Sequence, residues 1–554
     1  MHADGIGPFM AGLLRAFLLL ASAAPACLCA SCGDRGIEVD AGSETDQATE
    51  TGDDGGGEEP ASDPDTVEAD AGEDREEAEG EPDAPPDFTP NPDRIIADIA
   101  YLASDPCAGR EAGTPGNDLA LDYVEGLLRD LGLQPAGDGG TFRRSFEFPM
   151  WRQTAPPRVT LEGAELQSGV DFVVFRYSPS GAASGPILFA GYGLVVPPFD
   201  PVEYPECPID PAGYDDFAGL DLTGAVILKL KGVPNDSTRI SEGCPVEDGL
   251  AAAEERGAAA VITVMNYRWP PAVMAGVTVP HDNTYGIPLI LADRSLMEAS
   301  IPDLHAWASE IDARYQPGSR ATGLSASMTL STQVSTASTS NILGVMPGSD
   351  PSLSGEVVLV GAHIDHLAPD PSSGTIYPGA VDNASGTALV VELARGVVQA
   401  IGNPSRTVLF AAWNAEECRM LGSCAYTAAP SYPLAATRAV LNIDGVGGGS
   451  AAGLWLLSGT FEANAWLSDL MFASMLDRGI DGSLQRLPYS ENSDHACFIE
   501  MGVSTLSVSS IGDYPYVHSP GDTVERIHAD DLMLAARMMW ALLEPLALGT
   551  EALY

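Results

Sequence analysis

The chain has 554 residues, of which 45% are hydrophobic, and a formal net charge of −51 from 78 acidic and 27 basic residues. At roughly 100–200 residues per domain, this length predicts two or three folded units. The negative charge argues against nucleic acid as a partner, because phosphates bind basic surfaces, and against adsorption to anionic lipid.

Residues 1–32 have the pattern of an export signal. Arg15 precedes an apolar run over 16–21 that is too short for a membrane-spanning helix. Cys32 follows small residues and is typical of a bacterial lipoprotein cleavage site, although Cys29 stands where leucine is usual. We therefore expect an exported protein, which is either a cell-envelope lipoprotein with a lipid on Cys32 or an extracellular protein with a plain signal peptide.

The next segment is strongly acidic. Residues 33–88 contain 22 acidic residues and two arginines, a net charge of −20, and almost no large apolar side chains. Such a segment cannot bury enough apolar surface to offset the entropy lost on ordering. We expect residues 33–91 to form an extended, disordered linker.

The folded body is expected to begin near Pro92, with helices over 94–102 and 117–131. From about residue 157 to residue 321 short β-type runs appear, separated by loops rich in Pro, Gly and Asp, with one helix over 249–256. The runs are 171–177, 185–192, 225–230 and 259–265. This pattern predicts a separate β-rich domain.

From Ser340 onwards strands and helices alternate. Continuous apolar runs, which are typical of buried parallel strands, cover 356–362, 407–412, 439–443 and 503–509. Helices are expected over 384–399 and 531–543, the second of them ending before Pro545. The alternation predicts an α/β fold with a largely parallel sheet.

Six cysteines follow the leader, and an even number in an exported protein predicts disulfides. Proximity in the sequence favours the pairs Cys207–Cys244 and Cys418–Cys424, although other pairings remain open.

Metal-binding side chains follow each expected strand. Ligands in open α/β sheets gather beyond the carboxyl ends of the strands, so these side chains should meet. They are only His, Asp and Glu, a donor set that suits zinc. The residues are His363, Asp365, Asp382, Glu416, Glu417, Asp444 and His518.

Taken together, these motifs resemble peptidase family M28, whose members carry two zinc ions. The chain has His-x-Asp, Asp-Asn-x-Ser-Gly, Glu-Glu, Asp and His-Ser-Pro-x-Asp-Thr in the family's order. The loop with Gly109-Arg110 and Gly113–Gly116 also resembles the family's N-terminal loop, and Ser493-Asp494-His495 its late loop. Residues 157–321 resemble a protease-associated (PA) domain, which M28 peptidases often carry as an insertion.

The resemblance implies a zinc-exopeptidase-type α/β/α sandwich with a mostly parallel mixed sheet, plus the inserted β-rich PA domain. The peptidase domain would consist of an N-terminal part, 92–156, and a catalytic part, 322–554, on either side of the insertion at 157–321.

The resemblance also implies two Zn²⁺ ions per chain. Asp382 would bridge both ions, His363 and Asp444 would bind one of them, and Glu417 and His518 would bind the other. The two remaining roles are catalytic: Glu416 would be the general base, and Asp365 would hold the far nitrogen of the histidine that precedes it.

We therefore expect an exopeptidase acting on peptides or proteins, in particular an aminopeptidase that removes N-terminal residues with metal-activated water. A carboxypeptidase-type member is an alternative and would need a basic cluster, for which Arg419 and Arg486 are the candidates. Further alternatives are a glutaminyl-cyclase-type member of the same fold and a non-catalytic receptor-like module, although such a module would be expected to lose ligands. The sequence defines no oligomeric state.

Overall fold

The computed structural model describes most of the chain after the acidic segment. The described residues are 88–175, 178–241, 243–264, 285–370, 373–448, 454–457, 462–482, 484–486, 493–510 and 514–553. The predicted leader with Cys32, the linker up to residue 87 and the last residues of the predicted strands 171–177 and 259–265 lie outside them.

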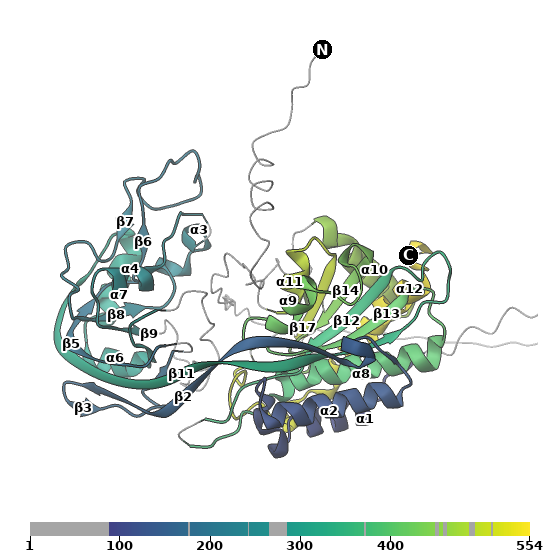
Figure 1. Ribbon diagram of the computed structural model, residues 1–554. Helices are drawn as coiled ribbons and strands as arrows, with labels where there is room; N and C mark the ends of the chain where they lie inside the picture. The colour runs from purple at the N-terminus through teal and green to yellow at the C-terminus, as the bar shows by residue number, and fades with distance from the viewer. Residues whose placement is uncertain are drawn as a thin grey trace, which may run out of the picture. The chain divides into compact units, whose positions relative to one another are not determined.

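The chain from Arg320 onwards is built on one mixed sheet, drawn in Figure 1. In spatial order its strands are β16 (Leu484–Arg486), β15 (Leu454–Leu457), β17 (Thr505–Ser510), β14 (Thr437–Ile443), β12 (Val357–His363), β13 (Thr407–Trp413) and β11 (Arg320–Met346). Neighbours are parallel from β13 through β12 and β14 to β17. β11 is antiparallel to β13, and β15 is antiparallel to β17 but parallel to β16.

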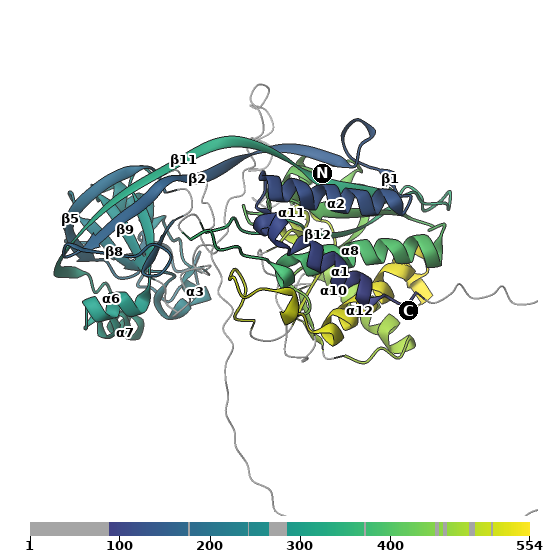
Figure 2. The ribbon, with the colours of Figure 1, turned by 90° about the horizontal axis from the view of Figure 1, so that it is seen from below.

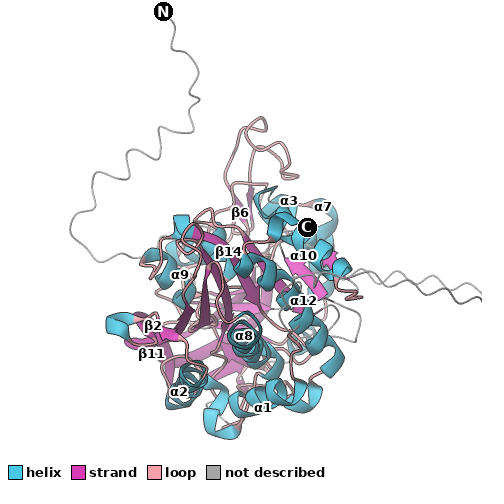
Figure 3. Ribbon diagram, turned by 90° about the vertical axis from the view of Figure 1, so that its right-hand side faces the viewer, coloured by secondary structure: helices cyan, strands magenta, loops and turns pink. Residues whose placement is uncertain are grey.

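Helices cover both faces of this sheet, as Figure 3 shows. Successive side chains of a strand point to opposite faces, so Val358 and Val360 pack in one apolar cluster and Val357 and Leu359 in another. The first cluster includes α1 (Pro92–Leu102), α2 (Pro115–Asp130), α8 (Ser385–Gly396), α10 (Glu462–Asp477) and α12 (Ala529–Leu548). The second includes side chains of α9 (Leu421–Ala428) and α11 (His495–Ile499). The predicted α/β sandwich with a mostly parallel mixed sheet is confirmed.

The segment 380–401, which contains α8, is long and apolar enough to span a membrane by composition alone. However, 78% of its apolar window is buried inside the fold, where α8 contacts α1, α12 and β12. These are the properties of a core helix.

Two long strands connect this sheet with the inserted segment (Figure 2). β2 (Arg143–Leu161) pairs with β11 in antiparallel fashion, from Arg143 opposite Ile342 to Leu161 opposite Ala326. The predicted domain boundaries at 156/157 and 321/322 fall inside these strands.

The inserted segment has apolar clusters of its own. Its strands β5, β8, β9 and β10 are mutually parallel, and β4 closes the row in antiparallel orientation. Helix α4 lies between β8 and β9 in the chain, and α6 and α7 follow β10, so the segment contains helices in addition to the predicted β-runs. The elements are β4 (Phe172–Val174), β5 (Gly181–Phe189), β8 (Val226–Leu230), α4 (Gly249–Glu255), β9 (Ala260–Val264), β10 (Leu289–Ala292), α6 (Arg294–Ser300) and α7 (Leu304–Arg314).

One predicted disulfide is confirmed and the other is wrong. Cys207 pairs with Cys244, as expected, but Cys424 pairs with Cys497 and not with Cys418. Cys424 and Cys497 are 73 residues apart in the chain, but their helices α9 and α11 lie side by side in the fold. Cys418 lies in an apolar cluster with Phe148.

The prediction that the last helix ends before Pro545 is also wrong. Helix α12 continues to Leu548 with Pro545 inside it. Proline has no N–H to donate to the carbonyl four residues earlier, which belongs to Ala541. The hydroxyl of Ser474 on the neighbouring helix α10 donates to that carbonyl at 2.6 Å, so the group freed by proline is satisfied by tertiary packing.

We predict that Ser474→Ala lowers the free energy of unfolding by about 1–3 kcal/mol, because it leaves the buried carbonyl of Ala541 without its donor. Denaturant unfolding monitored by circular dichroism measures this change. The matched control is Ser468→Ala, which removes a buried hydroxyl that bonds within its own helix. Equal midpoints for the two variants would contradict the role of Ser474.

Candidate metal centre

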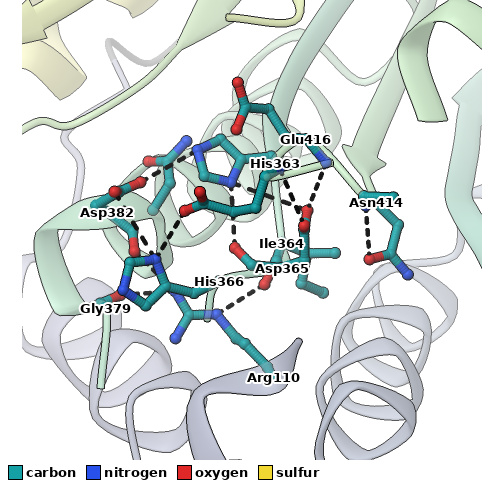
Figure 4. A network of polar contacts seen from close by, with 12 residues as sticks. Arg110, His363, Ile364, Asp365, His366, Gly379, Asp382, Asn414 and Glu416 are labelled. Atoms are coloured by element: carbon teal, nitrogen blue, oxygen red, sulfur yellow. Dashed lines mark hydrogen bonds and ion pairs between the residues drawn. The ribbon is translucent and has the colours of Figure 1, made fainter. Parts of the chain in front are cut away.

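The side chains predicted to form the site converge at one edge of the sheet. The parallel strands β12, β13, β14 and β17 present their carboxyl ends at that edge, and loops that follow them carry most of these side chains. Asp382 comes from the turn Ala380–Ala384, which precedes the buried helix α8. Figure 4 shows the convergence of several of these residues.

A first group of donor atoms surrounds one carboxylate oxygen of Asp382. His518 Nε2 lies 3.0 Å from Asp382 Oδ2 and 3.1 Å from Glu417 Oε1. His366 Nδ1, which was not predicted to belong to the site, lies 3.0 Å from Glu417 Oε1 and 3.7 Å from Asp382 Oδ2. Each of the four side chains offers one donor atom, and these atoms lie within 4.8 Å of one another.

A second group surrounds the other oxygen of Asp382. His363 Nε2 lies 3.3 Å from Asp382 Oδ1 and 3.3 Å from Asp444 Oδ1. Because Asp382 presents one oxygen to each group, it is the residue that the two groups share. This is the geometry that a bridging carboxylate needs.

The spacing and chemistry of both groups fit zinc. With metal–ligand bonds of about 2.0–2.2 Å, two donors of a tetrahedral ion lie about 3.3–3.6 Å apart. The donor atoms here are imidazole nitrogens and carboxylate oxygens at 3.0–3.7 Å. Closely packed carboxylates repel one another, and divalent cations offset that repulsion.

The surroundings of the carboxylates drive their pKa values apart. Burial opposes ionisation of Asp382, but hydrogen bonds with His363 and His518 outweigh it and hold its pKa well below the usual range. Burial by the surrounding protein, together with the charge of Glu417, raises the pKa of Glu416 well above the usual range, against the effect of His363. Glu416 belongs to neither donor group among the described residues and is therefore available to exchange a proton.

The carboxylate of Asp365 makes contacts other than the predicted one. It lies 4.0 Å from His363 Nδ1, beyond hydrogen-bond distance, and that nitrogen lies 3.1 Å from the backbone oxygen of Asp365 instead. The carboxylate accepts the backbone N–H groups of Glu416 and Glu417 at 3.0 and 3.3 Å, and burial raises its pKa to about 6. Asp365 therefore positions the Glu-Glu pair, a role that the spacing of His-x-Asp does not reveal.

A buried arginine holds the turn that carries Asp382. Arg110 donates to the backbone oxygens of Ile364 at 2.7 Å, Pro378 at 2.5 Å, Gly379 at 2.6 Å and Asp382 at 3.2 Å (Figure 4). The N-terminal loop is thereby joined to the segments that carry the two donor groups. The motif Gly109-Arg110 was noticed in the sequence, but this function follows only from the fold.

Asp522 holds the same turn by accepting hydrogen bonds from its backbone N–H groups. Its carboxylate accepts the backbone N–H groups of Val381 at 2.8 Å and Asp382 at 3.1 Å, and the hydroxyl of Tyr514 at 2.7 Å. The sequence singled out Asp522 only as part of the His-Ser-Pro-x-Asp-Thr motif. His366 had one usable signal, namely a second histidine three residues after His363.

We predict that Arg110→Lys lowers the thermal midpoint of unfolding and weakens metal retention, because lysine cannot reach several carbonyls from one planar group. Differential scanning fluorimetry and metal content after dialysis measure the two effects. Arg129→Lys, at an exposed position of α2, is the control. Wild-type values of both quantities in Arg110→Lys would show that the arginine does not position the site.

Residues 341–543 match peptidase family M28. Among curated proteins, the chain is 29% identical over 325 residues to the probable lipoprotein aminopeptidase LpqL of Mycobacterium tuberculosis, covering 57% of this chain and 50% of LpqL. It is 31% identical over 196 residues to aminopeptidase YwaD of Bacillus subtilis, covering 34% and 40%. The chain spans about half the length of these relatives.

Among solved structures, the fold is similar to that of an aminopeptidase from Aneurinibacillus sp. strain AM-1, with a TM-score of 0.61 and 20% identity over 82% of this chain and 93% of that one. It is also similar to a zinc aminopeptidase from Bacillus subtilis, with a TM-score of 0.57 and 20% identity over 82% and 94%. The family match contains both donor groups. Residues 341–543, which match peptidase family M28, are therefore the part of the chain that carries both donor groups.

Proposed function

We propose that the protein is a dinuclear zinc aminopeptidase that removes N-terminal residues from peptides, with Glu416 as general base. The observation that carries this proposal is the pair of donor groups sharing Asp382, with a carboxylate of raised pKa beside them. The relatives named above are aminopeptidases, which supports the same class of substrate.

Five side chains would hold the ions: His363, Asp382, Glu417, Asp444 and His518. When bound, two zinc ions supply Lewis acidity that polarises a scissile carbonyl and acidifies water. All five side chains offer imidazole nitrogen or carboxylate oxygen, which are donors that zinc accepts.

Glu416 would move the proton. As a carboxylate it takes the proton of the attacking water, and as a carboxylic acid it returns that proton to the leaving amine, so it ends each cycle unchanged. Its raised pKa suits the second of these steps. Asp365 keeps the backbone of Glu416 fixed by accepting its N–H, and this limits the motion of the base.

The acidic site also suits recognition of a substrate's free α-amine, which is positively charged near neutral pH. A substrate panel tests this specificity: aminoacyl substrates with a free amine, the same substrates N-acetylated, and peptides with amidated carboxyl ends, each with and without a chelator. An aminopeptidase is supported if hydrolysis needs a free α-amine on the substrate, proceeds when the carboxyl end is amidated and stops when chelator is added. Cleavage that instead requires a free carboxylate would make the protein a carboxypeptidase, and cyclisation of N-terminal glutamine would make it a glutaminyl cyclase.

Two further parts of the proposal concern location and the insertion. We propose that the protein is exported and held in the cell envelope through a lipid on Cys32 or released outside the cell, which the leader pattern and the name of the relative LpqL support. We propose that residues 157–321 are a PA domain. The apolar clusters of that segment are distinct from those that flank β12 and β14, which supports this assignment.

We predict that Glu416→Gln keeps its bound metal but lowers kcat by about 10²–10⁴-fold, because glutamine cannot accept a proton from water. Steady-state hydrolysis of an aminoacyl substrate and metal content per chain measure the two quantities. Glu165→Gln, an exposed position in the inserted segment, should leave both unchanged. Turnover of Glu416→Gln near the wild-type rate would rule out the assigned base.

A further inference from the structure

We infer that His366 is a fourth protein ligand of one metal ion, so that the two metal sites differ in ligand number. One site would be held by His366, Asp382, Glu417 and His518, and the other by His363, Asp382 and Asp444. This inference rests on the proposed two-metal function.

The position of the His366 ring favours ligation. His366 lies three residues beyond His363 and is fully buried. Its Nδ1 atom lies 3.0 Å from Glu417 Oε1 and 3.7 Å from Asp382 Oδ2, and both of these oxygens also face His518 Nε2. Two nitrogens and two oxygens thus surround one point at the spacing of tetrahedral zinc ligands.

The backbone makes room for this ring. Gly379 has a φ of +62°, and a Cβ atom built there would lie 2.6 Å from the His366 ring. Arg110 fixes the same glycine by donating to its backbone oxygen at 2.6 Å. A side chain at position 379 would push the imidazole away from the donor group, so the turn and the ring are matched.

The contacts of the imidazole also favour ligation. Both carboxylate oxygens that His366 Nδ1 faces belong to the donor group, and both also face His518 Nε2. The alternative is that His366 donates a hydrogen bond from Nδ1 to Glu417. That role needs a proton on Nδ1, whereas a metal ligand needs the lone pair of that nitrogen.

A functional difference between the two ions follows. Structural zinc sites have four protein ligands, whereas catalytic sites have three and keep one position open. The site with His366 should therefore hold its ion more tightly. The site of His363 and Asp444 should release its ion first and offer the open position to water or substrate.

The test uses His366→Asn in the full-length protein. The asparagine amide nitrogen replaces Nδ1 as a hydrogen-bond donor but cannot ligate zinc as imidazole does. The first readout is the number of zinc ions per chain as the chelator concentration is raised. The second is the visible absorption spectrum with one equivalent of Co²⁺, because four-coordinate Co²⁺ has intense visible bands. His363→Gln is the matched control, because it removes a ligand from the other site only.

We expect wild-type protein to lose its two zinc ions in two steps and to give the intense spectrum with the first Co²⁺ ion. The tight step is the release of the ion that wild type loses last. In His366→Asn this step should disappear, because the affinity for that ion falls by more than about 100-fold. Loss of a hydrogen bond to a metal ligand has a smaller effect. His363→Gln should keep both the tight step and the spectrum.

An unchanged tight step and spectrum in His366→Asn would overturn the inference and make His366 a hydrogen-bond donor to Glu417. If that variant does not fold, a crystal structure of zinc-loaded wild type decides: Nδ1 at about 2.0–2.1 Å from a zinc ion supports the inference, and a distance beyond 3 Å overturns it. If wild-type protein binds two zinc ions and hydrolyses substrate, and His366→Asn retains zinc as the wild type does, only the role of His366 is refuted. Wild type that binds no zinc refutes the proposed function as well.

Discussion

The concentration of carboxylates at the carboxyl edge of the sheet is the constraint on which the rest of this structure depends. Asp382 lies within reach of both Glu417 and Asp444, with Glu416 beside them. Such an arrangement is unfavourable without compensating charge. Three imidazoles lie between the carboxylates, and two divalent ions would supply the remaining positive charge.

Buried charged side chains hold these carboxylates in place by bonding to the backbone. Arg110 binds the carbonyl oxygens of the turn that carries Asp382, and Asp522 binds its N–H groups. Asp365 does the same for the N–H groups of the Glu-Glu pair. The donor atoms are therefore positioned by rigid loops, which is what a site preorganised for metal requires.

The sequence predicted the features that depend on local pattern. Apolar runs such as 356–362 and 407–412 identified buried parallel strands, and the residues that follow them marked the edge where the donor groups lie. The features that the local pattern did not predict depend on contacts between residues that are far apart in the sequence. Cys424 meets Cys497 because two helices pack on one face, and helix α12 passes through Pro545 because Ser474 satisfies a carbonyl. His366 was missed because its neighbours in space, Glu417 and His518, are 51 and 152 residues away in the chain.

The central claim is that two metal ions share Asp382. Metal analysis of zinc-loaded full-length protein, with wild type and Asp382→Ala side by side, tests it most directly. We expect two zinc ions per wild-type chain and at most one in the variant, because a single substitution removes a ligand from both sites. One zinc ion or none in wild type, or two retained in Asp382→Ala, would contradict it.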